Sequence, residues 1–331
     1  MNNADVALVS VISLGGTITM VKPGSGQGVV PTLDAQALLA TVPELATVGA
    51  RIAAHSFRSL PGAGVGFGDL TELVALIESE ISRGAHGIVV IQGTDTIEET
   101  SFFLDVAVRS EVPIVVTGAM RNPTMAGADG PANLLAAVCT AASEDARGLG
   151  SVVVLFDEIH AARFVRKTHS TSTGAFSSPN AGPIGRVVEG RASILVRPKR
   201  GPFVAPTAKT PHVRVAVVHV SLGDDGEQVR RLGDHFDGIV VAGFGAGHVP
   251  AAMVQALTEQ AARIPVVLTS RCTGGPVLHH TYGFPGSEQD LLNRGLIGAE
   301  YLDPFKARIL LQLLLGAGKS QREILSVFSA S

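Results

Sequence analysis

The stretch that most constrains the fold is residues 87–100, GIVVIQGTDTIEET. Its apolar run, Ile88–Ile91, has the length of a strand that is buried on both faces, as in a parallel sheet. The run stops at Gln92-Gly93, and apolar residues then recur at helical spacing from Ile97. The stretch therefore predicts a strand, a tight turn and a helix. Its polar side chains lie at the carboxyl end of the strand, where ligands bind in open α/β sheets.

The same succession of apolar run, turn and helix recurs through the first 170 residues. The expected strands are Val6–Leu14, Arg51–Phe57, Ile88–Ile91, Val112–Thr117 and Ser151–Phe156, and Ser59–Gly64 is expected to be a turn. The expected helices are Leu33–Val42 with Thr32 as N-cap, Asp69–Ser82 with Asp69 as cap, one after Thr96, and one from about Pro131. Such alternation predicts a parallel, doubly wound sheet of the flavodoxin-like kind, with helices on both faces.

A second α/β domain is expected after a break in the pattern. Between Ser170 and Pro211 the alternation is replaced by Gly, Pro and Ser, so the boundary is placed near residues 200–212. We therefore expect a larger N-terminal domain, residues 1–205, and a smaller C-terminal α/β domain, residues 212–331. The expected strands of the C-terminal domain are Val213–Val220, Gly238–Ala242 and Pro265–Ser270. Its expected helices are Pro250–Arg263, Phe305–Leu315 and Gln321–Phe328.

Composition and charge exclude several classes of protein. The net charge is −3 and the basic residues are scattered, which disfavours a nucleic-acid partner. Two cysteines, Cys139 and Cys272, make no disulfide framework, and no His/Cys spacing points to a metal. His279-His280 is expected to be a polar loop. The N-terminus has no basic segment before its short apolar run, so we expect a cytoplasmic protein with no membrane span. Only 17% of the residues are charged, which is consistent with surface buried in an oligomer.

Thr17 is the first candidate for chemistry. It follows Gly15-Gly16 at the end of the first expected strand, where glycines let a substrate approach the backbone. A hydroxyl in that place is a candidate nucleophile, and N–H groups beside it would stabilise an oxyanion. The alternative is a turn followed by an N-capping Thr. A dinucleotide-binding fingerprint is disfavoured, because GGTIT lacks the third glycine of GxGxxG.

Thr94, Asp95 and Lys167 are the second group of candidates. Thr94 and Asp95 have an alternative role as helix caps, although the polar cluster exceeds what one cap needs. Glu98 and Glu99 fit the first-turn preference of the helix dipole. Lys167 belongs either to a solvated basic face or to the site, where it would pair with Asp95 and activate a hydroxyl. Thr17, Thr94 and Lys167 follow three different expected strands, whose carboxyl ends meet at one edge of a parallel sheet.

In combination, these motifs resemble the bacterial L-asparaginase family, which includes glutaminase-asparaginases. The resemblance covers nearly the whole chain in the family's order and spacing. Its pieces are LGGTI (14–18), QGTDTIEET (92–100), PIVVTGAMR (113–121), AGADGPANL (126–134), DEIHAAR (157–163) with Lys167, GFGAG (243–247) and GLIGAEYLDPFKARIL (295–310).

The resemblance implies hydrolysis of L-asparagine through a covalent acyl-enzyme, with no metal or organic cofactor and glutamine as a side substrate. Thr17 would attack, while Thr94, Asp95 and Lys167 would relay a proton and orient water. Ser59 would bind the substrate carboxylate, Asp95 its ammonium, and the Ala119 main chain its amide. The family also implies two α/β domains and a tetramer built as a dimer of intimate dimers. Each site would be completed by the neighbour's smaller domain.

Three departures from the family pattern concern rate and specificity. Many members carry a tyrosine on the loop after GGTI, near Gly28 of this chain, where KPGSGQGVVP offers none. Either another group replaces that phenol or turnover is low. Leu60-Pro61 follows Ser59 where a polar residue is common, so one hydrogen bond to substrate is expected to be missing. The neighbour-supplied Asn aligns with Ala246 or His248, and His248 would either reach the substrate's amino end or cap the next helix.

Three other functions are weighed against the asparaginase. An amidotransferase subunit that supplies ammonia for a tRNA-bound substrate carries an added domain before its GGT, and here GGT begins at Gly15, so that role is not expected. A catalytically weak or inactive amino-acid-binding relative would suit the missing tyrosine and Leu60. A nucleotide-binding Rossmann protein is disfavoured, because the GxGxxG and P-loop signatures are absent.

Overall fold

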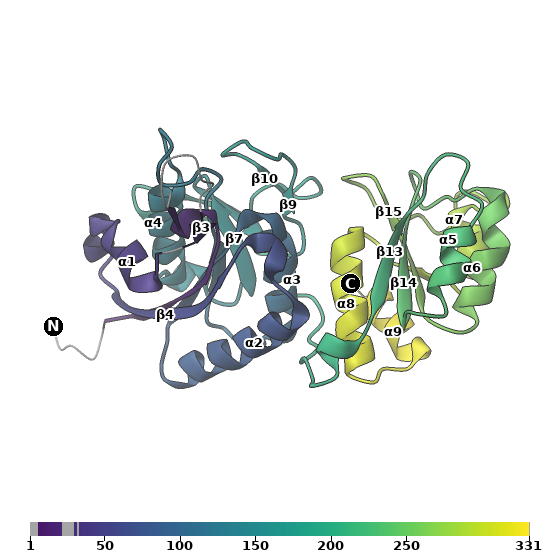
Figure 1. The fold of residues 1–331 in the computed structure, drawn as a ribbon, viewed down its shortest axis with the longest axis horizontal. Helices are drawn as coiled ribbons and strands as arrows, with labels where there is room; N and C mark the ends of the chain where they lie inside the picture. The colour runs from purple at the N-terminus through teal and green to yellow at the C-terminus, as the bar shows by residue number, and fades with distance from the viewer. Residues whose placement is uncertain (1–5, 22–29, 32, 331) are drawn as a thin grey trace. The chain divides into compact units, whose positions relative to one another are not determined.

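The computed structural model describes residues 6–21, 30–31 and 33–330 of the 331-residue chain. The chain divides into two compact units, Met1–Arg200 and Gly201–Ser331. Each unit is built on one main sheet with helices packed on both of its faces, as labelled in Figure 1. The expected fold class, two α/β domains of which the first is larger, is confirmed.

Five parallel strands form the centre of the first sheet. They are β1 (Leu8–Gly15), β4 (Arg51–Leu60), β5 (Gly87–Ile91), β6 (Ile114–Thr117) and β7 (Ser151–Leu155). They pair in the order β4-β1-β5-β6-β7, so the direction of strand addition reverses between β1 and β5. All residues of β5, β6 and β7 are buried, which explains their continuous apolar runs.

The first sheet is mixed rather than purely parallel, which corrects the expectation. Beyond β7 it continues through β8 (Glu158–Ala161), β11 (Gly185–Val188) and β12 (Arg191–Ile194), all antiparallel to their neighbours. A two-residue turn at Phe156-Asp157, with φ of 54° and 58°, folds β8 back onto β7. Such a turn normally uses Asn or Gly, so the sequence carried no hairpin signal. The other two strands are four residues long and lie among turns.

Helices cover both faces of the first sheet. On one face lie α1 (Ala35–Ala40) and α4 (Gly130–Ala141), and on the other lie α2 (Phe67–Ser82) and α3 (Ile97–Ala107). Two expected caps were wrong. Asp34 caps α1 by accepting the Ala37 N–H, and Thr32 lies outside the described residues. Gly66 is the N-cap of α2, with Asp69 three residues inside and bonded back to the Gly66 N–H.

Short elements connect these parts of the first unit. The expected turn Ser59–Gly64 is only partly a turn. Its first two residues, Ser59 and Leu60, end β4, and the 3₁₀ helix η3 (Gly62–Gly64) follows. The short elements are η1 (Thr17–Thr19), β2 (Met20–Val21), β3 (Val30–Pro31), η2 (Pro43–Thr47), η3 (Gly62–Gly64), η4 (Thr94–Thr96), η5 (Glu144–Ala146), β9 (Arg166–Lys167) and β10 (Phe176–Ser177).

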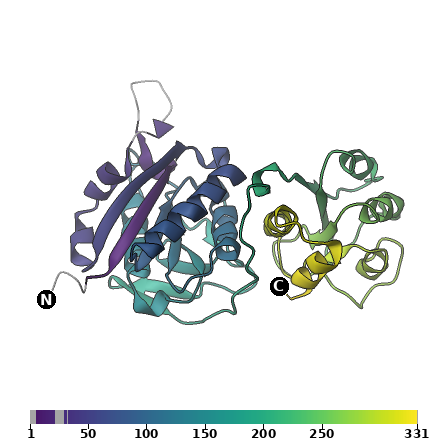
Figure 2. The same cartoon turned by 90° about the horizontal axis from the view of Figure 1, so that it is seen from below.

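The second unit is a parallel sheet in the order β13-β14-β15-β16. Figure 2 shows the yellow helices α8 and α9 apart from the green α5, α6 and α7 around this sheet. Short α5, α7 and β16 were not expected, and the expected helix Pro250–Arg263 is η7 followed by α6. The elements are η6 (Thr210–His212), β13 (Val215–His219), α5 (Glu227–Leu232), β14 (Gly238–Gly243), η7 (Ala251–Met253), α6 (Val254–Ala261), β15 (Val266–Ser270), α7 (Glu288–Asn293), β16 (Ile297–Gly298), α8 (Pro304–Gly316) and α9 (Gln321–Ser329).

Candidate active site

The candidate site lies at the carboxyl ends of β1 and β5. The strand order reverses between these two strands, and in an open α/β sheet that reversal leaves a crevice outside the strand ends, where ligands bind. Thr17 begins η1 just after β1, and Thr94 begins η4 just after β5. The topology therefore places both threonines on the two sides of one crevice.

Three glycines bring the turns of this edge into direct contact. A Cβ added to Gly16 would collide with the Gly93 nitrogen, and one added to Gly93 would collide with the Gly62 nitrogen. Gly16 also has φ of 92° and ψ of −175°, a conformation that is essentially restricted to glycine. The turns after β1, β4 and β5 thus pack backbone against backbone. Thr17 and Thr94, each one residue beyond a contacting glycine, are consequently held close together.

Lys167 joins the turn after β5 through its side chain. Its Nζ donates to Thr94 Oγ1 at 2.9 Å and to Asp95 Oδ1 at 2.7 Å. The Thr94 residue is buried, and the Lys167 side chain is 14% exposed, whereas the Asp95 side chain is 67% exposed. An ammonium shielded from solvent thus contacts a buried hydroxyl, while the carboxylate on its other side faces water. This arrangement can polarise the hydroxyl and transfer a proton.

The route by which Lys167 reaches this edge differs from the expected one. Lys167 does not follow β7 directly, because β8 runs back from Glu158 to Ala161 before the chain turns again. Residues 162–165 then lead to β9, whose Lys167 pairs with Phe176 of β10. The sequence predicts Lys167 at the carboxyl end of a parallel strand. The structure brings it there on a separate two-stranded hairpin.

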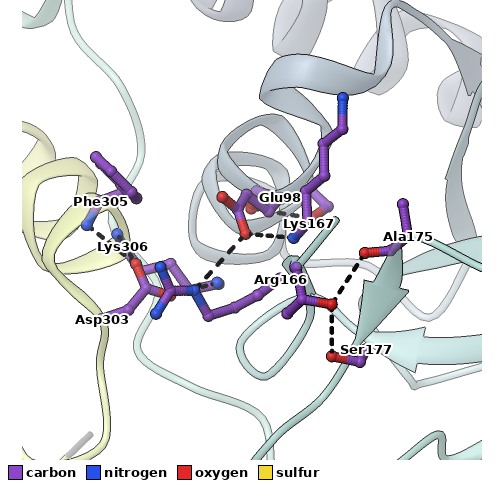
Figure 3. A network of polar contacts seen from close by, with 10 residues as sticks. Glu98, Arg166, Lys167, Ala175, Ser177, Asp303, Phe305 and Lys306 are labelled. Atoms are coloured by element: carbon purple, nitrogen blue, oxygen red, sulfur yellow. Dashed lines mark hydrogen bonds and ion pairs between the residues drawn. The ribbon is translucent and has the colours of Figure 1, made fainter. Parts of the chain in front are cut away.

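Glu98 holds the backbone of that hairpin, a contact that sequence reasoning missed. Its Oε2 accepts the Lys167 N–H at 2.9 Å and lies 4.0 Å from Arg166 Nε. Figure 3 shows Glu98 beside the backbone of Lys167, with the Lys167 side chain extending away from it. The sequence explained Glu98 by the helix dipole alone. Its carboxylate also fixes where the lysine side chain starts.

Ala119 lies two residues after the end of β6, beside Ile18, the residue that follows Thr17. A Cβ on Gly130 would lie 2.7 Å from Ile18 Cγ1 and 3.4 Å from the Ala119 Cβ, so these three residues pack together. Ala119 is fully buried. Its main chain therefore belongs to the same stretch of sheet edge as Thr17.

Asp129 and Asn133 hold the loop that contains Ala119. The Asp129 carboxylate accepts the N–H groups of Met120 at 3.0 Å and Arg121 at 2.8 Å. The Asn133 amide nitrogen donates to Gly118 O and to Asp129 Oδ2, both at 3.0 Å. In addition, Asn133 Oδ1 accepts the N–H of Phe156, after β7, at 3.0 Å. One buried amide on α4 thereby ties the ends of β6 and β7 together, and sequence reasoning missed both residues.

Ser59 and Leu60 are the last residues of β4, not part of a turn. A Cβ on Gly15 would lie 2.7 Å from the Leu60 nitrogen, so the end of β4 runs against the turn after β1. Ser59 is exposed and Leu60 partly buried. Both residues therefore border the Gly15–Thr17 turn, whereas the loop position near Gly28 lies outside the described residues.

His248 is held in the second unit by a buried carboxylate and two aromatic rings. Its Nε2 lies 3.1 Å from Glu288 Oε2, and its ring meets those of Tyr282 and Phe284 edge-on at 4.8 and 5.1 Å. Burial would raise the pKa of Glu288. However, N–H groups of Tyr282 and Thr281 and the His248 ring lower this pKa below its ordinary value. His248 therefore faces an ionised partner, with 22% of its own side chain exposed.

The alternative role of His248 as a helix cap is wrong. Pro250 is the N-cap of η7, and His248 instead forms a bridge with Phe244 across the glycine-rich turn. Ala246 lies inside that turn, where its carbonyl accepts the Leu278 N–H.

The part of the chain that the structure describes contains no metal-binding cluster of side chains and no membrane-spanning helix. Within residues 6–21, 30–31 and 33–330, no group of three or more His, Cys, Asp or Glu side chains is arranged to hold a metal ion. The same residues contain no helix that is both long and apolar enough to cross a membrane. Cys139 is buried on α4 and Cys272 is exposed, and both are free thiols.

The chain matches two protein-family models and is similar to known proteins. The model described as "Asparaginase, N-terminal" matches residues 8–200, and "Glutaminase/Asparaginase C-terminal domain" matches residues 214–328. The probable L-asparaginase of Deinococcus radiodurans is 34% identical over 331 residues, covering 98% of each chain. The L-asparaginase of Bacillus licheniformis is 34% identical over 317 residues, covering 94% of this chain and 96% of that one.

A solved structure is similar to the whole fold. The probable cytoplasmic L-asparaginase from Campylobacter jejuni has a TM-score of 0.88 at 30% identity, covering 98% of this chain and all of that one.

Proposed function

The chain belongs to the bacterial L-asparaginase family, and from that premise we propose that it hydrolyses L-asparagine to L-aspartate and ammonia through an acyl-Thr17 intermediate. The observation that carries the proposal is the contact of the Lys167 ammonium with Thr94 and Asp95, beside the Gly16–Gly93 junction. This arrangement supplies a proton-transfer group next to a second hydroxyl, Thr17, as two-step acyl transfer requires.

In the first step, Thr17 Oγ1 attacks the carbon of the side-chain amide. A C–O bond forms, the C–N bond breaks, and the threonine proton leaves with the nitrogen as ammonia. Backbone N–H groups near Thr17 and Thr94 would stabilise the oxyanion, an interaction worth about 10²–10³ in turnover for one donor. Since Tyr occurs only at positions 282 and 301 of the sequence, no loop phenol assists this step.

In the second step, water attacks the ester and releases L-aspartate and the Thr17 hydroxyl. Thr94 would orient the water, with its hydroxyl polarised by Lys167. As Thr17 leaves, the Lys167 ammonium would give a proton to the Thr17 oxygen and would take back the water proton through the Thr94 hydroxyl. The exposed carboxylate of Asp95 keeps Lys167 charge-balanced between turnovers. A positioned proton-transfer group of this kind contributes about 10²–10⁴ in rate.

The substrate's polar ends have candidate partners on the same edge. Ser59 would bind the α-carboxylate, Asp95 the α-ammonium, and the Ala119 main chain the amide. Leu60 would border the pocket without a hydrogen bond. His248 would approach the amino end of substrate in a neighbouring protomer. We expect L-glutamine to be a slower substrate because its side chain is one methylene longer.

The proposal also includes a cytoplasmic homotetramer, a dimer of intimate dimers, with no metal, organic cofactor or nucleic acid required. Light scattering of the purified protein tests the oligomer. Activity that is unchanged after dialysis against a chelator tests the independence from metal.

The deciding experiment is ammonia release from L-asparagine, D-asparagine and L-glutamine by the wild type and by Thr17→Ala. We expect the wild type to release ammonia from L-asparagine and, more slowly, from L-glutamine, and we expect Thr17→Ala to release none from either. Acid-quenched mass spectrometry should find the substrate-derived acyl group on the peptide that contains Thr17. Acylation elsewhere, or undiminished turnover by Thr17→Ala, would refute the assignment of the nucleophile.

The competing function is that of a weak or inactive amino-acid-binding relative, which the missing loop tyrosine favours. It predicts measurable L-aspartate binding with no ammonia above the Thr17→Ala background. The same preparation therefore separates the two functions.

A further inference from the structure

The hairpin that carries Lys167 is too small to hold itself in place. β9 and β10 contribute two residues each, and an isolated two-stranded hairpin is at best marginally stable in water. Its loop is closed locally by Thr168, whose N–H and hydroxyl both donate to Ala175 O. The position of the hairpin relative to Thr94 must therefore come from contacts with other elements.

One such contact lies on β9, and another lies directly after β10. On β9, the Lys167 N–H is held by Glu98 of α3 at 2.9 Å. Directly after β10, the Ser178 hydroxyl lies 3.0 Å from His160 Nδ1 on β8. His160 Nε2 lies in turn 3.2 Å from Glu158 Oε2. The second strand is thus tied to the main sheet through the imidazole ring.

The two partners of His160 determine which of its ring nitrogens carries the proton. A carboxylate only accepts hydrogen bonds, so Nε2 of His160 carries the proton and donates it to Glu158. Nδ1 of the neutral ring then accepts from the Ser178 hydroxyl. His160 is 1% exposed and Ser178 is 5% exposed, so neither group can exchange its partner for bulk water. Loss of the hydroxyl would leave a buried nitrogen without a donor, a costly state.

The charged groups that face the ring are Glu158 on its own strand and Arg186 on β11, and these two are paired with each other. Burial lowers the pKa of His160, with Glu158 opposing that effect, so the ring is neutral near pH 7. A neutral, fully bonded histidine in this place is suited to hold a hairpin rather than to transfer protons.

We propose that His160 and Ser178 are positioning residues for Lys167: they anchor β10 to the main sheet and thereby set the reach of the Lys167 ammonium to Thr94. The inference rests on the proposed role of Lys167 and extends it to two residues that do not touch substrate. A shift of about 1 Å in a catalytic group can cost about 10²-fold in rate, so a loosened anchor should act on kcat.

The test compares Ser178→Ala with Ser177→Ala in the purified full chain. Each change removes one serine hydroxyl, and the two serines are neighbours in the sequence. However, the Ser177 hydroxyl contacts Thr168 inside the hairpin and not the imidazole. We expect Ser178→Ala to lower kcat for L-asparagine about tenfold without raising KM, and Ser177→Ala to change kcat less than about twofold. Equal effects of the two variants would overturn the proposal.

A double-mutant cycle separates positioning of Lys167 from a general structural role. If Ser178 acts through Lys167, Ser178→Ala should cost little further activity in a Lys167→Met background, because the group that it positions is gone. The same fold-loss in both backgrounds would contradict the proposal. Wild-type turnover by Lys167→Met alone would instead refute the proposed role of the lysine.

Amide hydrogen exchange supplies a readout that does not depend on turnover. Peptides that cover residues 166–178 should exchange faster in Ser178→Ala than in the wild type and in Ser177→Ala, because the hairpin opens more often. Unchanged exchange would show that the imidazole does not anchor the hairpin.

Discussion

The Lys167 ammonium lies 2.9 Å from the Thr94 hydroxyl, although 73 residues separate them in the sequence. Thr94 is placed by the end of a central parallel strand, and Lys167 by a small hairpin held at Glu98 and His160. The contact therefore depends on the relative position of two parts of the first unit. It is the feature on which the proposed chemistry depends most.

Replacing Lys167 by methionine removes the ammonium and keeps most of the side-chain length. We expect kcat to fall about 10²–10⁴-fold, the range for loss of a positioned proton-transfer group. The melting temperature should change little, because the Asp95 carboxylate left behind is largely solvated. The control is Lys209→Met, at an exposed lysine of the second unit, which should keep wild-type kcat. A kcat for Lys167→Met within threefold of the wild type would contradict the prediction.

Gly16→Ala tests the backbone contact at the site. The new Cβ would collide with the Gly93 nitrogen, and the backbone conformation of Gly16 is essentially closed to alanine. We expect the free energy of unfolding to fall by about 2–5 kcal/mol from strain and overpacking, with loss of most activity. Gly49→Ala is the matched control, since Gly49 also has positive φ (72°) but has nothing within 4 Å of its Cβ position. It should cost about 1–2 kcal/mol and leave kcat unchanged. Thermal and denaturant unfolding measure the difference.

Asn133→Ala tests the amide that ties β6 to β7. It leaves Gly118 O and the Phe156 N–H without their buried partner, which should destabilise the fold by about 2–4 kcal/mol in total. The loop with Ala119 should also shift, so we expect KM for L-asparagine to rise. Asn293→Ala, at an exposed position that ends α7, serves as control and should change neither quantity. Equal melting temperatures for the two variants would show that the Asn133 network carries no stability.

Burial of His160 predicts a specific dependence of stability on pH. Because its pKa is lowered in the folded state, the unfolded chain binds more protons below its ordinary value of about 6.5. The contribution of the neutral ring is thus fully present above about pH 6.5. It is lost as the pH falls from there toward the lower folded-state pKa.

A non-titrating variant isolates that contribution. We expect the wild type to exceed His160→Gln in melting temperature at pH 7.5, and this advantage to shrink between pH 6.5 and pH 5. His212→Gln, at an exposed histidine of η6, is measured over the same range as the comparison. An advantage of the wild type over His160→Gln that grows on acidification would mean that the ring is held charged.

The sequence predicted the parallel centre of the first sheet, because buried parallel strands leave continuous apolar runs. The same reasoning put Thr17, Thr94 and Asp95 at strand ends, and the structure places these residues directly after β1 and β5. The antiparallel strands β8, β11 and β12 went unrecognised as a sheet extension. They are four residues long, and the Phe156-Asp157 turn carries no glycine.

The tertiary structure alone decided which polar groups support the carboxyl-end edge of the first sheet, where the candidate site lies. Glu98 meets Lys167 across 69 residues, and Asn133 meets Phe156 across 23. His160 meets Ser178 across 18, on a strand that the sequence did not reveal. Burial and helix or strand periodicity are local properties, so they can be read along the chain. A hydrogen bond between distant segments depends on how the sheet and hairpin are packed, and that packing has no local signature.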